Sequence, residues 1–207
     1  MFTGLSTLDE LLSKHQMILV YGEAGSGKTT LLLTIARNIS IRGEKALFIS
    51  TEGSLYEARI VGLEKDYSNI MFANINDFNE LLKAILLLPL LNTGKYIFID
   101  SINALYRLEA YHEKSIEKLG LILGILKYMT LHKGLKVFAS AQVRALEESG
   151  KEVVASGMPI LEYWFDLILK LNRLNGERIL RVVKPPGEDR IEVKFIIEKH
   201  GVEWIEY

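Results

Sequence analysis

The residues with the clearest chemical signature lie near the start of the chain, in the run Gly22-Glu23-Ala24-Gly25-Ser26-Gly27-Lys28-Thr29. A glycine, four free positions and then Gly-Lys-Thr is the spacing of a phosphate-binding loop. In such a loop, backbone N–H groups surround phosphate oxygens, the lysine ammonium reaches the outer phosphates and the threonine hydroxyl contacts Mg²⁺. The run therefore predicts a site for nucleotide phosphates, which a side chain at Gly22 or Gly27 would obstruct.

The segments on either side of this loop support the same interpretation. Met17 to Tyr21 is a short apolar run rich in strand-forming residues, and Thr30 to Ile39 is apolar at helical spacing. A buried strand before the loop and a helix after it form the context in which the motif binds phosphate. The positive end of the helix dipole would then face the phosphates.

Two further apolar runs lead into acidic residues. Lys45 to Ser50 predicts a buried strand that runs into Glu52, and Tyr96 to Ile99 leads directly into Asp100. Ligands of open α/β sheets bind at the carboxyl ends of the parallel strands. An aspartate in that position, downstream of a phosphate loop, has the form of a second nucleotide-binding element that helps to hold Mg²⁺.

Length and composition limit the class of protein. The chain has 207 residues, of which 49% are hydrophobic and 25% charged, and these values suit a globular protein with one domain over residues 1–207. A net charge of -1 gives no global attraction to nucleic acid, so DNA binding would need a local patch. The sequence has no cysteine, no signal-peptide pattern and no apolar stretch long enough to span a bilayer. We therefore expect a cytoplasmic protein with no membrane partner.

The remaining pattern predicts helices at 3–13, 54–63, from 77 to a stop at Pro89, and 115–133, strands at 70–72, 135–141, 164–171, 178–183, 191–197 and 202–205, and a mobile loop at 143–157. Ser6 or Thr7 is the expected N-cap of the first helix. In the long helix we expect Ile116 in the buried stripe. For Gly120 and Gly124 we favour close packing on the sheet over the alternative, a close contact with another helix. Strands that alternate with helices, followed by hairpins, favour an α/β fold whose mostly parallel central sheet is flanked by helices and ends in antiparallel strands.

The phosphate loop alone does not name a function, because GTPases, small-molecule kinases, transporter ATPases, helicases and recombination ATPases all contain one. The sequence has no Asn-Lys-x-Asp guanine-reading motif, no Leu-Ser-Gly-Gly-Gln signature and no Asp-Glu-Ala-Asp type of second motif. It also has no evident Arg-rich lid of the kind that nucleoside-type kinases need. These absences argue against several of the classes.

Four segments in a fixed order resemble the RecA-like recombinase ATPases and, within them, the archaeal RadB-type paralogues. The segments are Thr3-Gly4 with Leu8-Asp9 and Leu11-Leu12, then Phe48-Ile49-Ser50-Thr51-Glu52-Gly53 followed by Arg59, then Asp100-Ser101-Ile102 followed by Tyr106-Arg107-Leu108-Glu109, and finally Ser140-Ala141-Gln142-Val143. The resemblance runs over nearly the whole chain. It implies a RecA-like P-loop ATPase core.

This resemblance implies ATP as the ligand, with Mg²⁺. The implied nucleotide-binding residues are Gly22, Glu23, Ala24, Gly25, Ser26, Gly27, Lys28, Thr29, Thr30 and Arg59. Lys28 would hold the β and γ phosphates, and Arg59 would lie over the adenine. Thr29 and Asp100 would hold Mg²⁺.

The resemblance also implies roles beyond nucleotide binding. Glu52 would be the general base that orients the attacking water, and Gln142 would sense the γ-phosphate and pass its presence to the loop that follows. Arg107 and Arg144 would contact DNA. Plainer roles stay open at each position: a solvated turn carboxylate for Glu52, a polar strand end for Gln142 and exposed ion pairs for the two arginines.

The sequence departs from the family pattern in ways that bear on function. We expect neither the N-terminal DNA-binding domain of the full recombinases nor the linker whose Phe-x-x-Ala docks on a neighbouring subunit, and slow hydrolysis follows from that expectation. Arg144 and Lys151 are the only basic residues of 144–156, which makes strong binding of single-stranded DNA doubtful. Lys184 and Arg190 resemble in position the basic residues that reach a neighbour's nucleotide in filaments, although a simple exposed turn explains them as well.

The preferred hypothesis is an ATP-binding accessory protein of recombinational DNA repair, which binds a recombinase or DNA in its ATP state. The alternative is a signalling ATPase or kinase of the circadian-clock type that acts on protein. That group usually carries paired glutamates after its second strand, whereas Glu52 stands beside Gly53 here. A third possibility is an interaction module in which the nucleotide is only structural.

Overall fold

The computed structural model describes residues 1–207 apart from 55, 109–113, 144–156, 175, 188–190 and 206–207. In these residues, the strands are β1 Met17–Gly22, β2 Ala46–Ser50, β3 Ile70–Asn74, β4 Tyr96–Asp100, β5 Lys136–Gln142, β6 Leu167–Leu174, β7 Glu177–Lys184, β8 Glu192–Glu198 and β9 Gly201–Ile205. All nine belong to one sheet in the order β3-β2-β4-β5-β1-β6-β7-β8-β9. The strands pair in parallel from β3 to β6 and antiparallel from β6 to β9. The predicted sheet is confirmed.

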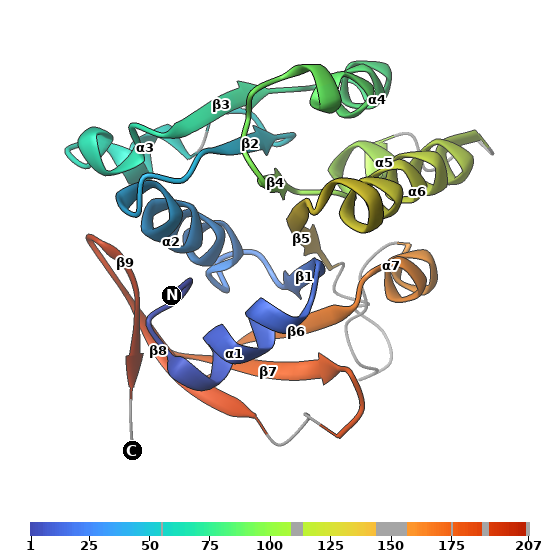
Figure 1. Cartoon of the computed structure of the whole chain (residues 1–207). Helices are drawn as coiled ribbons and strands as arrows, with labels where there is room; N and C mark the ends of the chain where they lie inside the picture. The colour runs from blue at the N-terminus through green and yellow to red at the C-terminus, as the bar shows by residue number, and fades with distance from the viewer. Residues whose placement is uncertain (55, 109–113, 144–156, 175, 188–190, 206–207) are drawn as a thin grey trace.

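The helices in the described residues are α1 Ser6–Lys14, α2 Lys28–Ile41, α3 Glu57–Ile60, α4 Phe78–Leu87, α5 Ala104–Leu108, α6 Lys114–Lys133 and α7 Met158–Trp164, with short 3₁₀ turns at Glu64–Tyr67 and Leu88–Leu90. The helices α1 and α2 cover one face of the sheet, and α4, α6 and α7 cover the other (Figure 1). The protein is therefore a three-layer α/β structure of the class that the sequence predicts.

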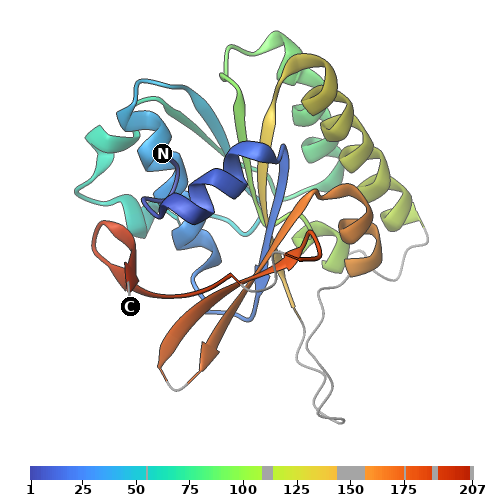
Figure 2. The same cartoon turned by 60° about the horizontal axis from the view of Figure 1, so that its bottom comes forward.

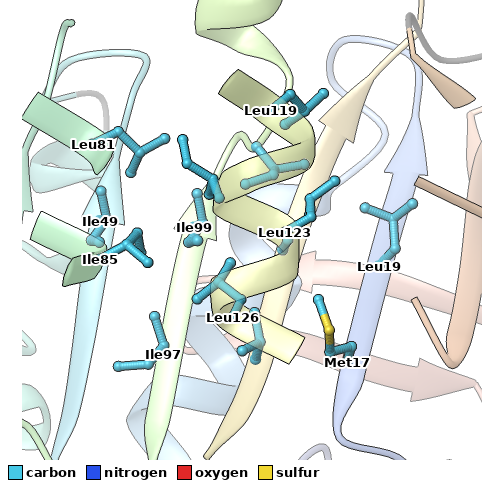
Figure 3. Close-up of a cluster of buried hydrophobic side chains, with 14 of the residues drawn as sticks. Met17, Leu19, Ile49, Leu81, Ile85, Ile97, Ile99, Leu119, Leu123 and Leu126 are labelled. Carbon is cyan, nitrogen blue, oxygen red and sulfur yellow. The ribbon is translucent and has the colours of Figure 1, made fainter. Parts of the chain in front are cut away.

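The alternation of side chains along β1 divides the core into two clusters. All six β1 residues are buried, as expected for a strand covered on both faces. Met17 and Leu19 face the side of α4 and α6, where they pack with Leu123 and Leu126 (Figure 3). Ile18 and Val20 lie in the opposite cluster with α1 and α2. Burial on both faces holds β1 rigidly, and the phosphate loop follows it directly.

The sheet curls around α2, so that its C-terminal edge strand touches this helix (Figure 1). Thr34 of α2 accepts a hydrogen bond from Val202 N of β9 at 3.0 Å through its hydroxyl oxygen. A Cβ atom at Gly201 would lie 2.3 Å from that oxygen, so glycine is required for the close approach. The antiparallel extension thus returns to the helix that begins at the phosphate loop.

Several local predictions were wrong. The N-cap of α1 is Leu5, without a side-chain cap, and not Ser6 or Thr7. Its first turn is instead braced by Asp9 Oδ1, which accepts hydrogen bonds from Thr3 N at 2.6 Å and Thr3 Oγ1 at 2.8 Å. In the predicted helix 54–63, only Glu57–Ile60 is described as α-helix.

The predicted strand 164–171 begins too early, because Trp164 completes α7 and β6 starts at Leu167. The helix α7 has seven residues, which is too short for a periodic apolar pattern to reveal. Gly157 caps it in the left-handed conformation at φ 78°. The predicted loop 143–157 otherwise falls on 144–156, outside the described residues.

Two predictions for the long helix α6 were also wrong. Ile116 is 46% exposed and lies off the buried stripe, which Leu119, Ile122, Leu123 and Leu126 form. A Cβ atom on Gly120 or Gly124 would meet Ile160 at 3.4 Å or Trp164 at 3.5 Å, so the two glycines face α7 and not the sheet. These distances are ordinary van der Waals contacts, so α7 packs against this face of α6 without requiring glycine there.

Candidate functional site

The phosphate loop connects β1 to α2 at the carboxyl end of the sheet, as its sequence predicts. Gly27 is the N-cap of α2 and has a left-handed backbone at φ 106°, a conformation that favours glycine. A helix that begins at Lys28 leaves its first backbone N–H groups unpaired within the helix. These donors and the positive end of the helix dipole form a ready anion site.

The two outer glycines of the motif are needed for contacts that the sequence did not predict. A Cβ atom at Gly22 would lie 2.2 Å from the carbonyl oxygen of Leu171 in β6. At Gly27 it would lie 3.2 Å from the ring of Phe195 and 3.3 Å from Ile197, both in β8. Glycine therefore lets the loop sit against the antiparallel half of the sheet, in addition to any approach of phosphates.

Lys28 points back into the loop and is buried, with 7% of its surface exposed. Its Nζ atom donates to the carbonyl oxygens of Gly22 at 2.9 Å and Glu23 at 2.7 Å. Burial lowers the pKa of the Lys28 ammonium, while the charges of Asp100 and Glu52 act in the opposite direction. The loop thus holds a largely desolvated cation, which two carbonyl oxygens and the charges of Asp100 and Glu52 stabilise.

Glu52 follows β2 and meets the ends of the two neighbouring strands. Its Oε1 atom accepts a hydrogen bond from Ser101 Oγ at 2.7 Å, and its Oε2 atom accepts one from Gln142 Nε2 at 2.7 Å. The strand order places β4 between β2 and β5, which brings these three residues together from separate parts of the chain. Both carboxylate oxygens are therefore held in place, which a solvated turn carboxylate would not be.

Gln142 ends β5 and joins Glu52 to Arg107. Arg107 Nη1 of α5 donates to Gln142 Oε1 at 2.5 Å. Asn103 fixes the backbone of the same residue, because its side chain accepts from Gln142 N at 3.0 Å and donates to Gln142 O at 2.9 Å. The Glu52–Gln142–Arg107 chain is thus a continuous hydrogen-bond relay from the loop side of the site to α5.

Asp100 lies at the end of β4, with 6% of its surface exposed. Its Oδ1 atom accepts a short hydrogen bond from Ser140 Oγ of β5. Thr51 joins the same strand ends, since its hydroxyl donates to Ser101 O at 2.7 Å and accepts from Ser101 N at 3.0 Å. Ser101 and Ser140 belong to the segments that resemble the family, yet their contacts, like those of Asn103, cannot be predicted until a strand order is known.

A cavity of about 430 Å³ contains most of the predicted residues. It is lined by Ala24, Gly25, Gly27, Lys28, Thr29, Ser50, Glu52, Tyr56, Arg59, Asp100, Gln142, Arg173, Arg178 and Ile197. Gly22, Glu23, Ser26, Thr30 and Arg107 are not in that lining. Four of the lining side chains are cationic and two are anionic, which suits a polyanionic ligand.

A second cavity, of about 370 Å³, adjoins the first, because Arg59 and Ile197 line both. Thr30 lines the second cavity and accepts a hydrogen bond from Arg59 Nη1 at 2.5 Å. Apolar side chains such as Leu33 and Val61 contribute to its wall. The predicted nucleotide residues Thr30 and Arg59 therefore lie together at the junction of the two cavities.

The chemistry of the cavity fits a nucleoside triphosphate with Mg²⁺. The Ser26 hydroxyl is buried and has no hydrogen-bond partner among the described residues, so the loop offers an unused polar group beside its backbone N–H groups. No group of three or more histidine, aspartate or glutamate side chains in the described part of the chain could hold a metal ion. Mg²⁺ needs few protein ligands, because it also binds substrate phosphates and water. Thr29 and Asp100, both in the cavity lining, therefore suit Mg²⁺ without a further protein ligand.

The two predicted DNA contacts differ in what the structure describes. Arg107 is half-buried, and its head group is directed at Gln142. Arg144 lies outside the described residues, as do Glu109, Lys151 and Arg190. Lys184 donates to Glu162 O and Phe165 O, both at 2.7 Å, and so is bound to the end of α7. DNA contact by Arg107 and Arg144 stays a prediction.

Arg173 and Arg178 are the charged cavity residues that the sequence did not predict, beside the less polar Tyr56 and Ile197. These arginines flank the sequence Asn175-Gly176, which is a strong hairpin signal. A two-residue turn at that place would set the register and oppose the two arginines, so the signal was available. Their position beside the phosphate loop was not, because it depends on the parallel pairing of β6 with β1.

A phosphate loop on a parallel sheet, with an acidic residue after β2 and another at the end of β4, defines a nucleotide-binding ATPase of the RecA-like class. Residues 14–158 match the family described as AAA domain. Two curated RadB proteins are 35% and 30% identical to this chain over nine tenths or more of each length, so the chain belongs to the RadB family of RecA-like DNA repair and recombination proteins. The predicted resemblance is thereby confirmed.

The similar proteins carry consistent names. The DNA repair and recombination protein RadB of Methanocaldococcus jannaschii is 35% identical over 201 residues, which cover 90% of this chain and 92% of that protein. The protein of the same name from Methanococcus maripaludis strain C7 is 30% identical over 213 residues, which cover 96% and 98%. A solved structure titled as the RadB recombinase matches with a TM-score of 0.80 and 27% identity and covers 100% of both chains. None of the helices in the described part of this chain combines the length and apolar character of a membrane span.

Proposed function

We propose that this protein binds and slowly hydrolyses ATP and serves as an accessory factor in homologous recombination and DNA repair, with its ATP state controlling binding to a recombinase or to single-stranded DNA. The observation that carries the proposal is the hydrogen bond of 2.7 Å between Gln142 Nε2 and Glu52 Oε2. It links the proposed base to the end of the strand that leads into 144–156. A change at the phosphates can therefore alter the start of that segment.

Each end of the nucleotide has residues suited to it. Lys28 and the loop N–H groups would hold the β and γ phosphates, whose negative charge offsets the cost of burying the ammonium. Arg59 would lie against the adenine at the junction of the two cavities, beside Thr30. Thr29 and Asp100 would hold Mg²⁺, which when bound neutralises charge that develops on the phosphate oxygens.

Glu52 would orient the attacking water and receive its proton. Gln142 Nε2 carries two N–H donors, and its bond to Glu52 uses one of them. The γ-phosphate would be a competing acceptor that draws the amide away from Glu52. Arg107 holds the amide oxygen of Gln142 and so defines which side carries the N–H donors. Hydrolysis removes the competing acceptor and returns the amide to Glu52.

Slow turnover follows from the hydrogen bonds that Glu52 already accepts. Ser101 and Gln142 each donate to one carboxylate oxygen at 2.7 Å. These bonds stabilise the charged carboxylate and so weaken it as a base. A partner that draws Gln142 toward the γ-phosphate would remove one of the two bonds. This supports basal hydrolysis that is weak and rises with DNA or a protein partner.

The test is ATP hydrolysis by the purified protein with and without single-stranded DNA. Glu52→Gln should abolish hydrolysis and retain ATP binding, since the amide is isosteric but is not a base. Glu57→Gln is the matched control, because Glu57 is exposed on the nearby α3. Stimulation of the wild-type protein by DNA supports the DNA-linked form of the proposal. Hydrolysis by Glu52→Gln at the wild-type rate would reject Glu52 as the base.

The same variant addresses the possibility that the nucleotide is only structural. If Glu52→Gln loses hydrolysis but still supports repair in cells, ATP is a ligand whose hydrolysis is dispensable. The clock-type signalling alternative is not favoured, because the similar curated proteins are named for DNA repair and recombination.

A further inference from the structure

Two arginines stand directly opposite each other in the hairpin of β6 and β7. The antiparallel register pairs Arg173 with Arg178. Cβ atoms of directly paired residues on antiparallel strands lie about 4.5–5.5 Å apart and point to the same face of the sheet. Like charges in that arrangement repel each other, so the pair costs stability unless an anion lies nearby.

The pair points to the face that carries the phosphate loop. Arg173 continues the alternation of Leu169 and Leu171, and both leucines belong to the core cluster on the side of α2. Arg178 is paired on its other side with Phe195, the ring that approaches Gly27. Both arginines line the cavity that contains Lys28. Figure 2 shows the β6–β7 hairpin extending at the same end of the sheet as the loop that follows β1.

No ion pair joins either arginine to a carboxylate among the residues that the structure describes. Arg178 Nε is buried and has no hydrogen-bond partner there. Arg181, three positions further along β7, is different, because it pairs with Glu192 of β8 at 2.6 Å. Arg181, which does not line the cavity, thus has a carboxylate partner. Arg173 and Arg178, which line it, have no described counter-charge.

We infer that Arg173 and Arg178 form a second phosphate-binding element, which contacts the phosphate groups of the nucleotide from the side opposite Glu52 and Asp100. The guanidinium groups are suited to phosphate because they present several N–H donors in a plane. The inference rests on the proposed nucleotide site and adds two binding residues to it from the same chain. It also explains why a repulsive pair is retained in an otherwise ordinary hairpin.

The experiment measures binding of a fluorescent ATP analogue, and competition by inorganic tripolyphosphate, for Arg173→Gln and Arg178→Gln. In each variant, the dissociation constants of both ligands should rise about tenfold, because a charge-assisted hydrogen bond to phosphate is lost. Arg181→Gln, the matched control on the same strand, should bind within about twofold of wild type. Arg178→Lys keeps the charge without the planar donors and should recover part of the affinity.

Thermal unfolding without nucleotide, in a buffer free of phosphate, separates this role from a structural one. Arg178→Gln should unfold at the wild-type temperature or above, because it removes a like-charge contact. Unfolding at a clearly lower temperature would show that Arg178 holds the hairpin, and would overturn the inference.

The binding results also separate this inference from the proposed site. If Lys28→Ala does not weaken either ligand, the nucleotide site itself is wrongly placed. If Lys28→Ala weakens both but Arg173→Gln and Arg178→Gln bind like wild type, only the arginine inference fails. Tenfold weaker binding of tripolyphosphate supports contact with the phosphates, whereas weaker binding of the ATP analogue alone would overturn it.

Discussion

The two sides of the nucleotide cavity are built in opposite ways. On the parallel side, Glu52, Asp100 and Gln142 accept hydrogen bonds from Ser101, Ser140 and Arg107 respectively. Gln142 also donates to Glu52, so these side chains are held before any ligand arrives. On the antiparallel side, the arginine pair of β6 and β7 has no described counter-charge. Lys28 lies between them. It is buried, and its ammonium group donates hydrogen bonds to two carbonyl oxygens of the loop.

This difference separates two tasks. Groups that handle a proton or a water must be positioned in advance, since small displacements are costly in rate. Groups that bind a polyanion gain more if they have no internal partner, since a charged ligand does not then need to displace one. Substitutions at Lys28, Gln142, Ser26 and Gly124 test this difference, and their expected effects decrease in that order.

Lys28→Ala should have the largest effect, because it removes the cation that both sides share. We expect the dissociation constant for ATP to rise about 100-fold, the scale of lost hydrogen bonds between charged groups. Titration with a fluorescent ATP analogue measures it. Lys14→Ala on the surface of α1 is the control and should bind like wild type. Tight ATP binding by Lys28→Ala would mean that the two sides do not share this cation.

Gln142→Leu tests the pre-positioned side. It removes the amide that would reach the γ-phosphate and the acceptor of Arg107, so we expect kcat to fall about tenfold while KM for ATP changes little. The control is Gln16→Leu, at the only other glutamine of the chain. A rise in KM with unchanged kcat would assign Gln142 to binding and blur the distinction between the two sides.

Ser26→Ala asks whether the loop itself behaves like the unpaired side. The Ser26 hydroxyl is buried without a described partner, so the free energy of unfolding without nucleotide should rise by about 1 kcal/mol. Thr34→Val is the contrasting variant and should lower it, because the Thr34 hydroxyl donates to Thr30 O at 2.8 Å and accepts from Val202 N at 3.0 Å. Denaturant unfolding compares the two. Loss of stability in Ser26→Ala would show that its hydroxyl has a partner within the folded protein.

Gly124→Ala should have the smallest effect, because α6 is remote from both sides of the cavity. A Cβ atom there would make an ordinary contact of 3.5 Å with Trp164, so higher helix propensity should add about 0.5–1 kcal/mol of stability. ATP hydrolysis should not change. Gly27→Ala should instead lose stability, because its φ of 106° strains any other residue. A changed hydrolysis rate in Gly124→Ala would connect the α6–α7 contact to the site.

Much of the site could be predicted because its signals are local. The phosphate loop is a continuous motif, and Glu52, Asp100 and Gln142 each follow an apolar run that predicts a strand. The short helix α7 could not be predicted, since seven residues give no clear period and its stability comes from packing on α6. The contacts of Ser101 and Ser140 with the acidic residues, and of Asn103 with the backbone of Gln142, could not be predicted either, because the partners are far apart in the sequence.

Short-range spacing and alternation in the sequence encode the phosphate loop, the type of most strands and helices and the acidic residues at strand ends. Which strand ends meet depends on the tertiary fold. The order β2-β4-β5-β1-β6 is not the order of the chain, and it brings Glu52 to Gln142 and the β6–β7 arginines to the loop. Backbone hydrogen bonds between strands and the burial of two apolar faces select that order, and both act between residues that are far apart in the sequence.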